Sequence, residues 1–312
     1  MKINANILAL ISLCCFCICK GGIALGQSRG GAVQDTIMRF TLPSIPSSLT
    51  TVGERADYLV RHYWDSVDFA DAACLRHTDI IEQAWVDYCD ILNHVPLMTA
   101  RESMRNTVER AYANREVFDF IVDLADKYLY DPASPMRNEE FYIPVLEAMI
   151  AAPLLDDIEK LRPKAQLELA KKNRIGSKAE NFKYTSASGK RSSLYRQKAD
   201  YIVLFINDPG CHVCMQTLRE LKKAANINLM LEQKRLAVLS IYTGNEIGRW
   251  RRHLDDFPKE WINGYDRRSA IEEQRLYDLQ VIPTLYLLDK EKVVLLKDAS
   301  VQAIEDYLSR QQ

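Results

Sequence analysis

Two cysteines three residues apart are the part of the sequence best suited to chemistry. Cys211 and Cys214 enclose His212-Val213 and follow directly on Asp208-Pro209-Gly210. If a helix begins at Cys211, the unpaired amide groups and the positive dipole end at its N-terminus favour a thiolate there, and a protonated His212 adds to that effect. We therefore expect Cys211 to be the nucleophile of a disulfide exchange. Cys214, one turn further along the same face, is then the resolving thiol.

A buried strand and an amphipathic helix are predicted on either side of this pair. Residues 201–207 form a continuous apolar run, which is typical of a strand covered on both faces, and residues 215–225 have the apolar spacing of a helix. Pro209 and Gly210 provide the sharp turn between them and are expected to leave the sulfur of Cys211 facing solvent.

In the rest of the C-terminal part, predicted strands also alternate with predicted helices. Apolar runs recur at 236–242, 284–288 and 293–296, with helical patterns between and after them at 246–254, 271–279 and 301–308. Strands that alternate with helices predict a central sheet flanked by helices. We therefore expect an α/β domain over residues 173–312.

The preceding part, residues 49–172, is expected to be an all-α domain. Its segments place apolar residues at intervals of three and four, as helices with one buried face do. Residues 156–170 are predicted to form the last of these helices, interrupted or kinked at Pro163. The basic stretch that ends at Gly176 favours a helix end and a domain boundary close to it.

The N-terminus is typical of an export signal. Lys2 precedes an apolar run that holds four cysteines, and Ala24-Leu25-Gly26 provides small residues at a cleavage site before Gln27. We expect a signal peptide at 1–26, a flexible polar linker at 27–48, and no transmembrane span after cleavage. An uncleaved anchor and a lipoprotein signal are alternatives, although Phe16-Cys17-Ile18 before Cys19 does not fit a lipobox. The expected location is the periplasm or cell envelope.

Composition narrows the functional classes. The chain has 312 residues, 41 basic and 42 acidic side chains and 8 Cys. Without the signal, which holds two Lys and no acid, 39 basic and 42 acidic side chains remain. No positive excess is available to bind nucleic acid or an anionic membrane surface. Export places the remaining cysteines, Cys74, Cys89, Cys211 and Cys214, where disulfides persist.

Residues 177–312 resemble the thioredoxin superfamily, in particular the secreted thiol:disulfide interchange branch. The resemblance rests on the strand, Cys211-x-x-Cys214 and the helix, followed about seventy residues later by Val281-Ile282-Pro283-Thr284. It implies a cis Pro283 facing the cysteines and a backbone at Ile282 that pairs with an extended substrate. It also implies a thiol:disulfide oxidoreductase that acts on protein thiols and disulfides with an upstream redox partner and no organic cofactor.

The chain departs from this family at three points. Thioredoxins proper have Trp before the first cysteine and Gly-Pro between the two, where this chain has Gly210 and His212-Val213. Many relatives also have a buried carboxylate beneath the pair, whereas here Asp200 and Asp208 only flank the predicted strand. The redox potential and the base for Cys214 are therefore not implied by the resemblance.

The helical part also resembles a known family. LVRHYWD at 59–65, DPASPMRNEE at 131–140 and PLLDD at 153–157 are similar to the DUF5106 domain, which precedes thioredoxin-like domains in Bacteroidetes proteins. The resemblance implies no activity for this domain.

Other interpretations remain open at this point. Cys211 and Cys214 could form a structural disulfide, or hold copper or zinc together with His212 and a further ligand such as His253. Cys74 and Cys89, fifteen residues apart, could be bonded or free. The helical domain could be the working part of a non-catalytic adaptor, with the thioredoxin-like domain as a scaffold.

Overall fold

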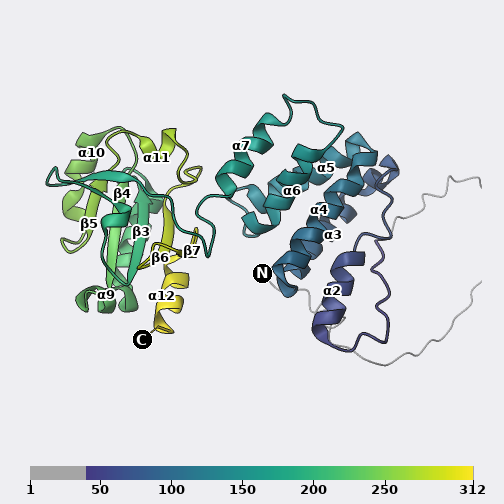
Figure 1. Cartoon of the computed structure of the whole chain (residues 1–312), viewed down its shortest axis with the longest axis horizontal. Coiled ribbons are helices and arrows are strands. Elements are labelled where there is room, and N and C mark those ends of the chain that lie inside the picture. The colour runs from purple at the N-terminus through teal and green to yellow at the C-terminus, as the bar shows by residue number, and fades with distance from the viewer. Residues whose placement is uncertain (1–39, 312) are drawn as a thin grey trace, which may run out of the picture. The chain divides into compact units, whose positions relative to one another are not determined.

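The computed structural model describes residues 40–311, which form two compact units that divide between Pro163 and Lys164 (Figure 1). The predicted signal peptide at 1–26 and residues 27–39 of the predicted linker lie outside the described residues. Within 40–311, no helix combines the length and the apolar composition needed to cross a bilayer.

The first unit is helical, as predicted. Its helices are α2 (Val52–His62), α3 (Thr78–Ile91), α4 (Leu97–Arg110), α5 (Arg115–Ala125) and α6 (Glu139–Ala151). Short 3-10 turns lie at Ala72–His77, Leu92–His94 and Ala111–Ala113, and a π-helical turn at Asp126–Tyr130 extends α5. Thr51 caps α2, while Asn114 and Asn138 accept amide hydrogen bonds at the starts of α5 and α6. These caps fix where three of the helices begin.

Aromatic side chains fill the centre of the first unit. Tyr63, Trp64, Trp85 and Tyr88 are buried, and the ring centroids of Tyr63 and Tyr88 lie 5.1 Å apart. Phe40 extends this cluster, because its ring centroid lies 5.0 Å from that of Tyr63. Residues 40–48, the part of the predicted linker that the structure describes, contain no helix or strand, but this contact holds their start against the helices.

The last helix before the sheet, α7 (Leu161–Ala170), starts later than predicted. The prediction of a helix over 156–170 broken or kinked at Pro163 is wrong, because Pro163 lies in the first turn, where a missing N–H disrupts no helical hydrogen bond. Asp156 instead forms a turn, in which its carboxylate accepts from the amides of Ile158 and Glu159 at 2.9 and 2.8 Å. The division between the units falls inside α7, and the domain boundary predicted between 172 and 173 follows its end.

The second unit contains a seven-stranded mixed sheet in the order β2-β1-β5-β4-β3-β6-β7. Strands β3, β4 and β5 are parallel, and the remaining pairings are antiparallel. The strands are β1 (Lys183–Ser186), β2 (Arg191–Ser193), β3 (Tyr201–Asn207), β4 (Leu236–Tyr242), β5 (Ile262–Tyr265), β6 (Thr284–Asp289) and β7 (Val294–Leu296). The helices are α8 (His212–Lys223), α9 (Ala225–Glu232), α10 (Ile247–Arg252), α11 (Ala270–Glu273) and α12 (Val301–Ser309), with 3-10 turns at Leu194–Arg196 and Leu254–Asp256.

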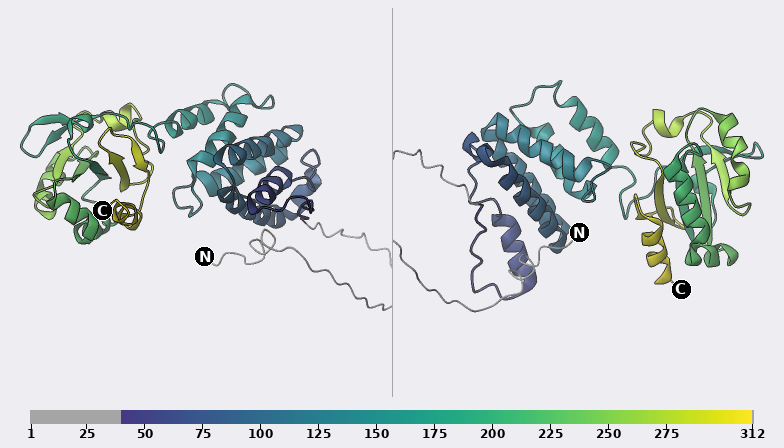
Figure 2. Two further views of the ribbon diagram at one scale, coloured as in Figure 1. Left: turned by 60° about the horizontal axis from the view of Figure 1, so that its bottom comes forward. Right: turned by 180° about the vertical axis from the view of Figure 1, so that it is seen from behind.

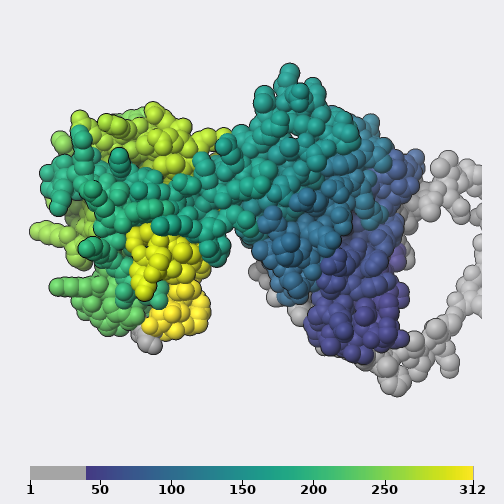
Figure 3. All heavy atoms as spheres, viewed as in Figure 1, coloured from purple at the N-terminus to yellow at the C-terminus, as the bar shows by residue number. Residues whose placement is uncertain are grey.

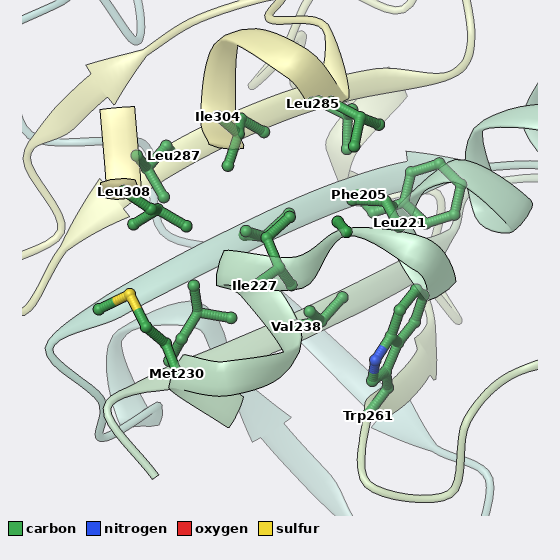
Figure 4. Close-up of a cluster of buried hydrophobic side chains, with 14 of the residues drawn as sticks. Phe205, Leu221, Ile227, Met230, Val238, Trp261, Leu285, Leu287, Ile304 and Leu308 are labelled. Carbon is green, nitrogen blue, oxygen red and sulfur yellow. The ribbon is translucent and has the colours of Figure 1, made fainter. Parts of the chain in front are cut away.

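Different elements cover the two faces of this sheet. Val203 and Phe205 of β3 pack under α8, α9 and α12, while the alternate residues Ile202, Leu204 and Ile206 pack on the opposite face with Tyr277 and α11. Figure 2 shows α8 (green) and α12 (yellow) on the same face, and Figure 4 shows the side chains of this core pointing toward one another from helices and strands. In the space-filling view, yellow atoms of the C-terminal segment lie directly against green atoms of the same unit (Figure 3). The predicted α/β fold class, with a sheet flanked by helices, is confirmed.

Three local differences from the sequence-based expectations occur in the second unit. Strand β5 and helix α9 were not predicted, and the helix expected over 271–279 is only the four-residue α11. Arg275 ends that segment because its backbone is left-handed, with φ of 48°.

Candidate active site

The loop between β3 and α8 is shaped by Asp208. Its carboxylate accepts a hydrogen bond from the Gly210 amide at 2.7 Å, and its carbonyl accepts one from the Cys211 amide at 3.0 Å. An aspartate that binds the backbone two residues ahead forms a tight turn, and Pro209 within it is buried. The predicted sharp turn therefore has a third participant besides Pro209 and Gly210.

Cys211 is the N-cap residue of α8. Its sulfur accepts a hydrogen bond from the Cys214 amide at 3.3 Å, as a capping side chain does at the start of a helix. The residue is half-buried, and its thiol donates to the carbonyl oxygen of Ile282 at 3.7 Å. The sulfur therefore lies where an amide N–H and the positive end of the helix dipole both favour negative charge.

Ile282 and Pro283 lie beside this cysteine although they are seventy residues away in sequence. Antiparallel pairing of β3 with β6 aligns Ile206 with Thr284, which brings the segment just before β6 to the end of β3. The Ile282–Pro283 peptide bond is cis, as the resemblance implies. Ile282 and Pro283 are partly exposed, and Val281 is 46% exposed.

Cys214 has a different environment from Cys211. It is 1% exposed, and its sulfur accepts a hydrogen bond from the Asp208 amide at 3.4 Å. Burial, with smaller contributions from Cys211 and the negative charge of Asp208, raises the pKa of the Cys214 thiol to about 12. Cys214 is therefore a neutral thiol until its proton is removed.

Arg249, which no sequence pattern linked to the site, lies beside the loop between β3 and α8. Arg249 of α10 lies over Gly210: a Cβ added at Gly210 would be 2.6 Å from its Nη1. Arg249 also pairs with Glu246 at 2.9 Å, and the Tyr242 hydroxyl accepts from the Glu246 amide at 3.1 Å. The Asp-Pro-Gly turn was a sequence signal for Asp208, but no local pattern connects Arg249 to Gly210.

His212 is exposed on the first turn of α8. His253, the further metal ligand considered from the sequence, has its Nδ1 2.8 Å from the carboxylate of Asp256. Within residues 40–311, no three His, Cys, Asp or Glu side chains are grouped so that they could hold a metal ion. Cys74, Cys89, Cys211 and Cys214 are all free thiols in the structure, and both Cys74 and Cys89 are buried.

Comparisons with known proteins agree with this architecture. Residues 26–173 match the family model described as a domain of unknown function, DUF5106. The structure of a thioredoxin-like protein from Bacteroides caccae is 62% identical, with 89% of this chain and all of that one covered and a TM-score of 0.86. The C-terminal domain of an uncharacterized protein from Bacteroides fragilis is 52% identical over 44% of this chain and 98% of its own, with a TM-score of 0.43.

Another similar structure is the thioredoxin domain of a thiol-disulfide oxidoreductase from Bacteroides vulgatus. It is 17% identical over 44% of this chain and 97% of its own, with a TM-score of 0.40. A search of curated proteins gave no match. Identity and coverage across both units with the Bacteroides caccae protein show that this chain belongs to the thioredoxin-like proteins, with a DUF5106 domain ahead of the thioredoxin-like domain.

Proposed function

We propose that this protein is an exported thiol:disulfide oxidoreductase that acts on protein disulfides through Cys211 and Cys214. The observation that carries the proposal is the environment of the Cys211 sulfur. It caps a helix, is partly open to solvent, and lies 3.7 Å from the Ile282 carbonyl and one turn from a buried second thiol. A structural disulfide needs neither the opening to solvent nor the neighbouring Ile282 carbonyl.

In the first step, the Cys211 thiolate attacks one sulfur of a substrate disulfide. A bond forms between Cys211 and that sulfur, the substrate S–S bond breaks, and the departing sulfur keeps the electron pair and takes a proton from solvent. The Cys214 amide, which already points at the Cys211 sulfur at 3.3 Å, stabilises the negative charge before the attack.

In the second step, Cys214 attacks the Cys211 sulfur of the mixed disulfide. Cys214 must first lose the proton that burial stabilises, and we propose Asp208 as the acceptor because its backbone contacts the Cys214 sulfur, with an amide-to-sulfur distance of 3.4 Å. The substrate leaves with its second sulfur as a thiolate. It has gained two electrons, and the protein holds a Cys211–Cys214 disulfide.

A dithiol partner upstream then reduces this disulfide, while the reverse sequence of steps oxidises a dithiol substrate. The redox state of that partner therefore sets the direction.

Substrate docking is proposed at the surface around Cys211. The backbone of Ile282 pairs with an extended substrate segment, and Pro283 lies next to it. Val213 and Val281 are 55% and 46% exposed on this surface and offer apolar contacts to the residues that flank the substrate cysteine.

Location in the periplasm or cell envelope is proposed from the N-terminal sequence at 1–26. Mass determination of the mature protein from its native host tests this part. A start at Gln27 supports signal cleavage, a lipid-modified cysteine at the new N-terminus supports the lipid-anchored form, and an intact Met1 contradicts signal cleavage.

Trapping with Cys214→Ser tests the catalytic proposal. Without the resolving thiol, Cys211 is expected to accumulate mixed disulfides that reducing agent releases on a gel and that mass spectrometry identifies. The double variant Cys211→Ser, Cys214→Ser is the control and must trap nothing. An empty trap in cells, together with no turnover of protein disulfides by the wild type, would support the adaptor interpretation instead.

A further inference from the structure

A hollow of about 540 Å³ opens on the second unit at the end of β3 that lies away from Cys211. It is lined by residues just before β3, just before β4 and in the turn between β6 and β7. The charged residues of its lining are Lys198, Asp200, Lys234, Lys290 and Lys292. Three segments separate in sequence therefore place four ammonium groups around one opening.

This positive charge is poorly compensated. Asp200, the one carboxylate of the lining, pairs with Arg235 at 3.5 Å, and Lys290 lies 3.7 Å from the exposed Glu291. In the described part of the chain, no ion pair joins Lys198, Lys234 or Lys292 to a carboxylate. Like charges that share a hollow repel one another, so an anion between them would be stabilised.

Lys292 is unusual because it is 5% exposed. Its ammonium donates one hydrogen bond, to the Lys290 carbonyl at 2.6 Å, which leaves two of its three N–H donors for another acceptor. Burial lowers the pKa of Lys292 despite the nearby Asp289 and Glu291. A buried ammonium is costly unless an anion compensates it.

The backbone of two of these lysines is also unfavourable. Lys234 and Lys292 have φ of 59° and 71°, in the left-handed region that glycine and asparagine occupy more easily. Lysine at these positions is not explained by turn geometry, and both side chains line the same hollow.

We propose that this hollow binds a small anion that carries one or more phosphate groups. Every cation of the lining is a lysine, and a lysine ammonium binds phosphate oxygens as a compact point charge. Because four ammonium groups share the opening, an anion with several negative charges, such as a condensed phosphate or a phosphorylated small molecule, fits best. The site is separate from Cys211 and does not depend on the proposed redox function.

Titration of the full mature chain with pyrophosphate tests the proposal. Inorganic phosphate, potassium chloride at matched ionic strength and vesicles that contain an anionic phospholipid serve as comparisons. Binding is measured by calorimetry and by the rise in Tm that a ligand of the native state causes. Pyrophosphate is expected to raise Tm at concentrations where chloride does not.

Two lysine variants and a matched control separate binding from structure. Lys234→Gly and Lys292→Met are each expected to weaken pyrophosphate binding about tenfold. Arg275→Gly also removes a cation from a left-handed residue, with φ of 48°, but outside the hollow. Both glycine variants are expected to be at least as stable as the wild type, and only Lys234→Gly should lose affinity.

The proposal is contradicted if pyrophosphate binds no better than chloride, if Arg275→Gly weakens binding as much as Lys234→Gly, or if only the vesicles bind. If Lys292→Met disturbs folding, Lys198→Gln replaces it in the test, because Lys198 is exposed and its loss removes a charge of the hollow without affecting the core. Unchanged affinity in all three lysine variants would also contradict the proposal.

Discussion

At the scale of single residues, the two cysteines of the motif differ in their exposure to solvent. Cys211 ends a loop and remains partly exposed, whereas Cys214 is directed under the helix and is 1% exposed. The spacing of the pair predicts their order along the helix. The burial of Cys214 depends on the tertiary packing around it, which the spacing does not contain.

The raised pKa of Cys214 predicts a specific loss of stability in alkali. The ordinary value of 9.0 applies to the unfolded chain, and the folded value is about 12. Between these values the unfolded state binds fewer protons, so this contribution is fully present below about pH 9 and is lost as pH rises toward 12, by at most ~1.4 kcal/mol per pH unit. Cys214→Ser removes it.

Urea unfolding under reducing conditions at pH 7.5 and 10.5 measures this effect. The wild type is expected to lose ~1 to 2 kcal/mol more than Cys214→Ser between the two values. Other buried groups with raised pKa, such as Tyr88, titrate in both proteins and cancel in the comparison. Equal losses in the two proteins would show that Cys214 ionises as freely in the folded state as in the unfolded one.

At the scale of elements, two glycines of the second unit differ in the space around them. A Cβ at Gly264 of β5 would lie 2.4 Å from the ring of Tyr184, which is buried, whereas a Cβ at Gly248 of α10 would meet nothing closer than 3.7 Å. Gly264→Ala is therefore expected to destabilise the second unit by about 1 to 3 kcal/mol. Gly248→Ala should change stability little or raise it by up to about 1 kcal/mol.

Fluorescence-detected urea unfolding of both variants checks this contrast, because Trp250 and Trp261 report on the second unit. If Gly264→Ala is as stable as Gly248→Ala, the packing of β5 against β1 described above is wrong.

The elements that the sequence predicted well are those with uninterrupted apolar runs. Residues 201–207 and 236–242 are strands over their full predicted length because both faces are buried. Strand β5 is short and includes Gly264, so no pattern distinguished it from a loop. Helix α9 follows α8 directly after Ala224, with no glycine or proline to mark the break.

In the candidate site, too, the sequence indicated the residues that a local pattern marks. The sequence proposes Cys211, Cys214, Ile282 and Pro283 as site residues because local motifs mark them. Asp208 lies in a recognisable turn, although no sequence pattern indicated that its carboxylate accepts a hydrogen bond from the Gly210 amide. The contact of Arg249 with Gly210 depends on how α10 follows β4, and only tertiary structure shows it.

At the scale of the whole molecule, each unit has its own core. Tyr63, Trp64 and Trp85 belong to the first, and Leu221, Val238 and Trp261 to the second. Leu221→Ala is expected to lower the free energy of unfolding of the second unit by about 2 to 5 kcal/mol, because it leaves a cavity beneath α8. The first unit should keep its unfolding midpoint.

Each unit contains two of the four tryptophans, so tryptophan fluorescence can follow the unfolding of each unit separately. In a Trp64→Phe, Trp85→Phe background, fluorescence follows the second unit, and in a Trp250→Phe, Trp261→Phe background it follows the first. A matching shift of both transitions by Leu221→Ala would contradict two independent cores.

Equilibrium redox titration of the mature chain tests whether Cys211 and Cys214 form a reversible redox couple. The protein is equilibrated with dithiothreitol buffers of graded potential and quenched with acid, and each cysteine is scored by alkylation and mass spectrometry. We predict one reversible two-electron transition that maps to Cys211 and Cys214, persists in the Cys74→Ser, Cys89→Ser variant and disappears in Cys214→Ser. Peptides with Cys211 and Cys214 that stay reduced at every potential, or a transition that maps to Cys74 and Cys89, would contradict a redox role for Cys211 and Cys214.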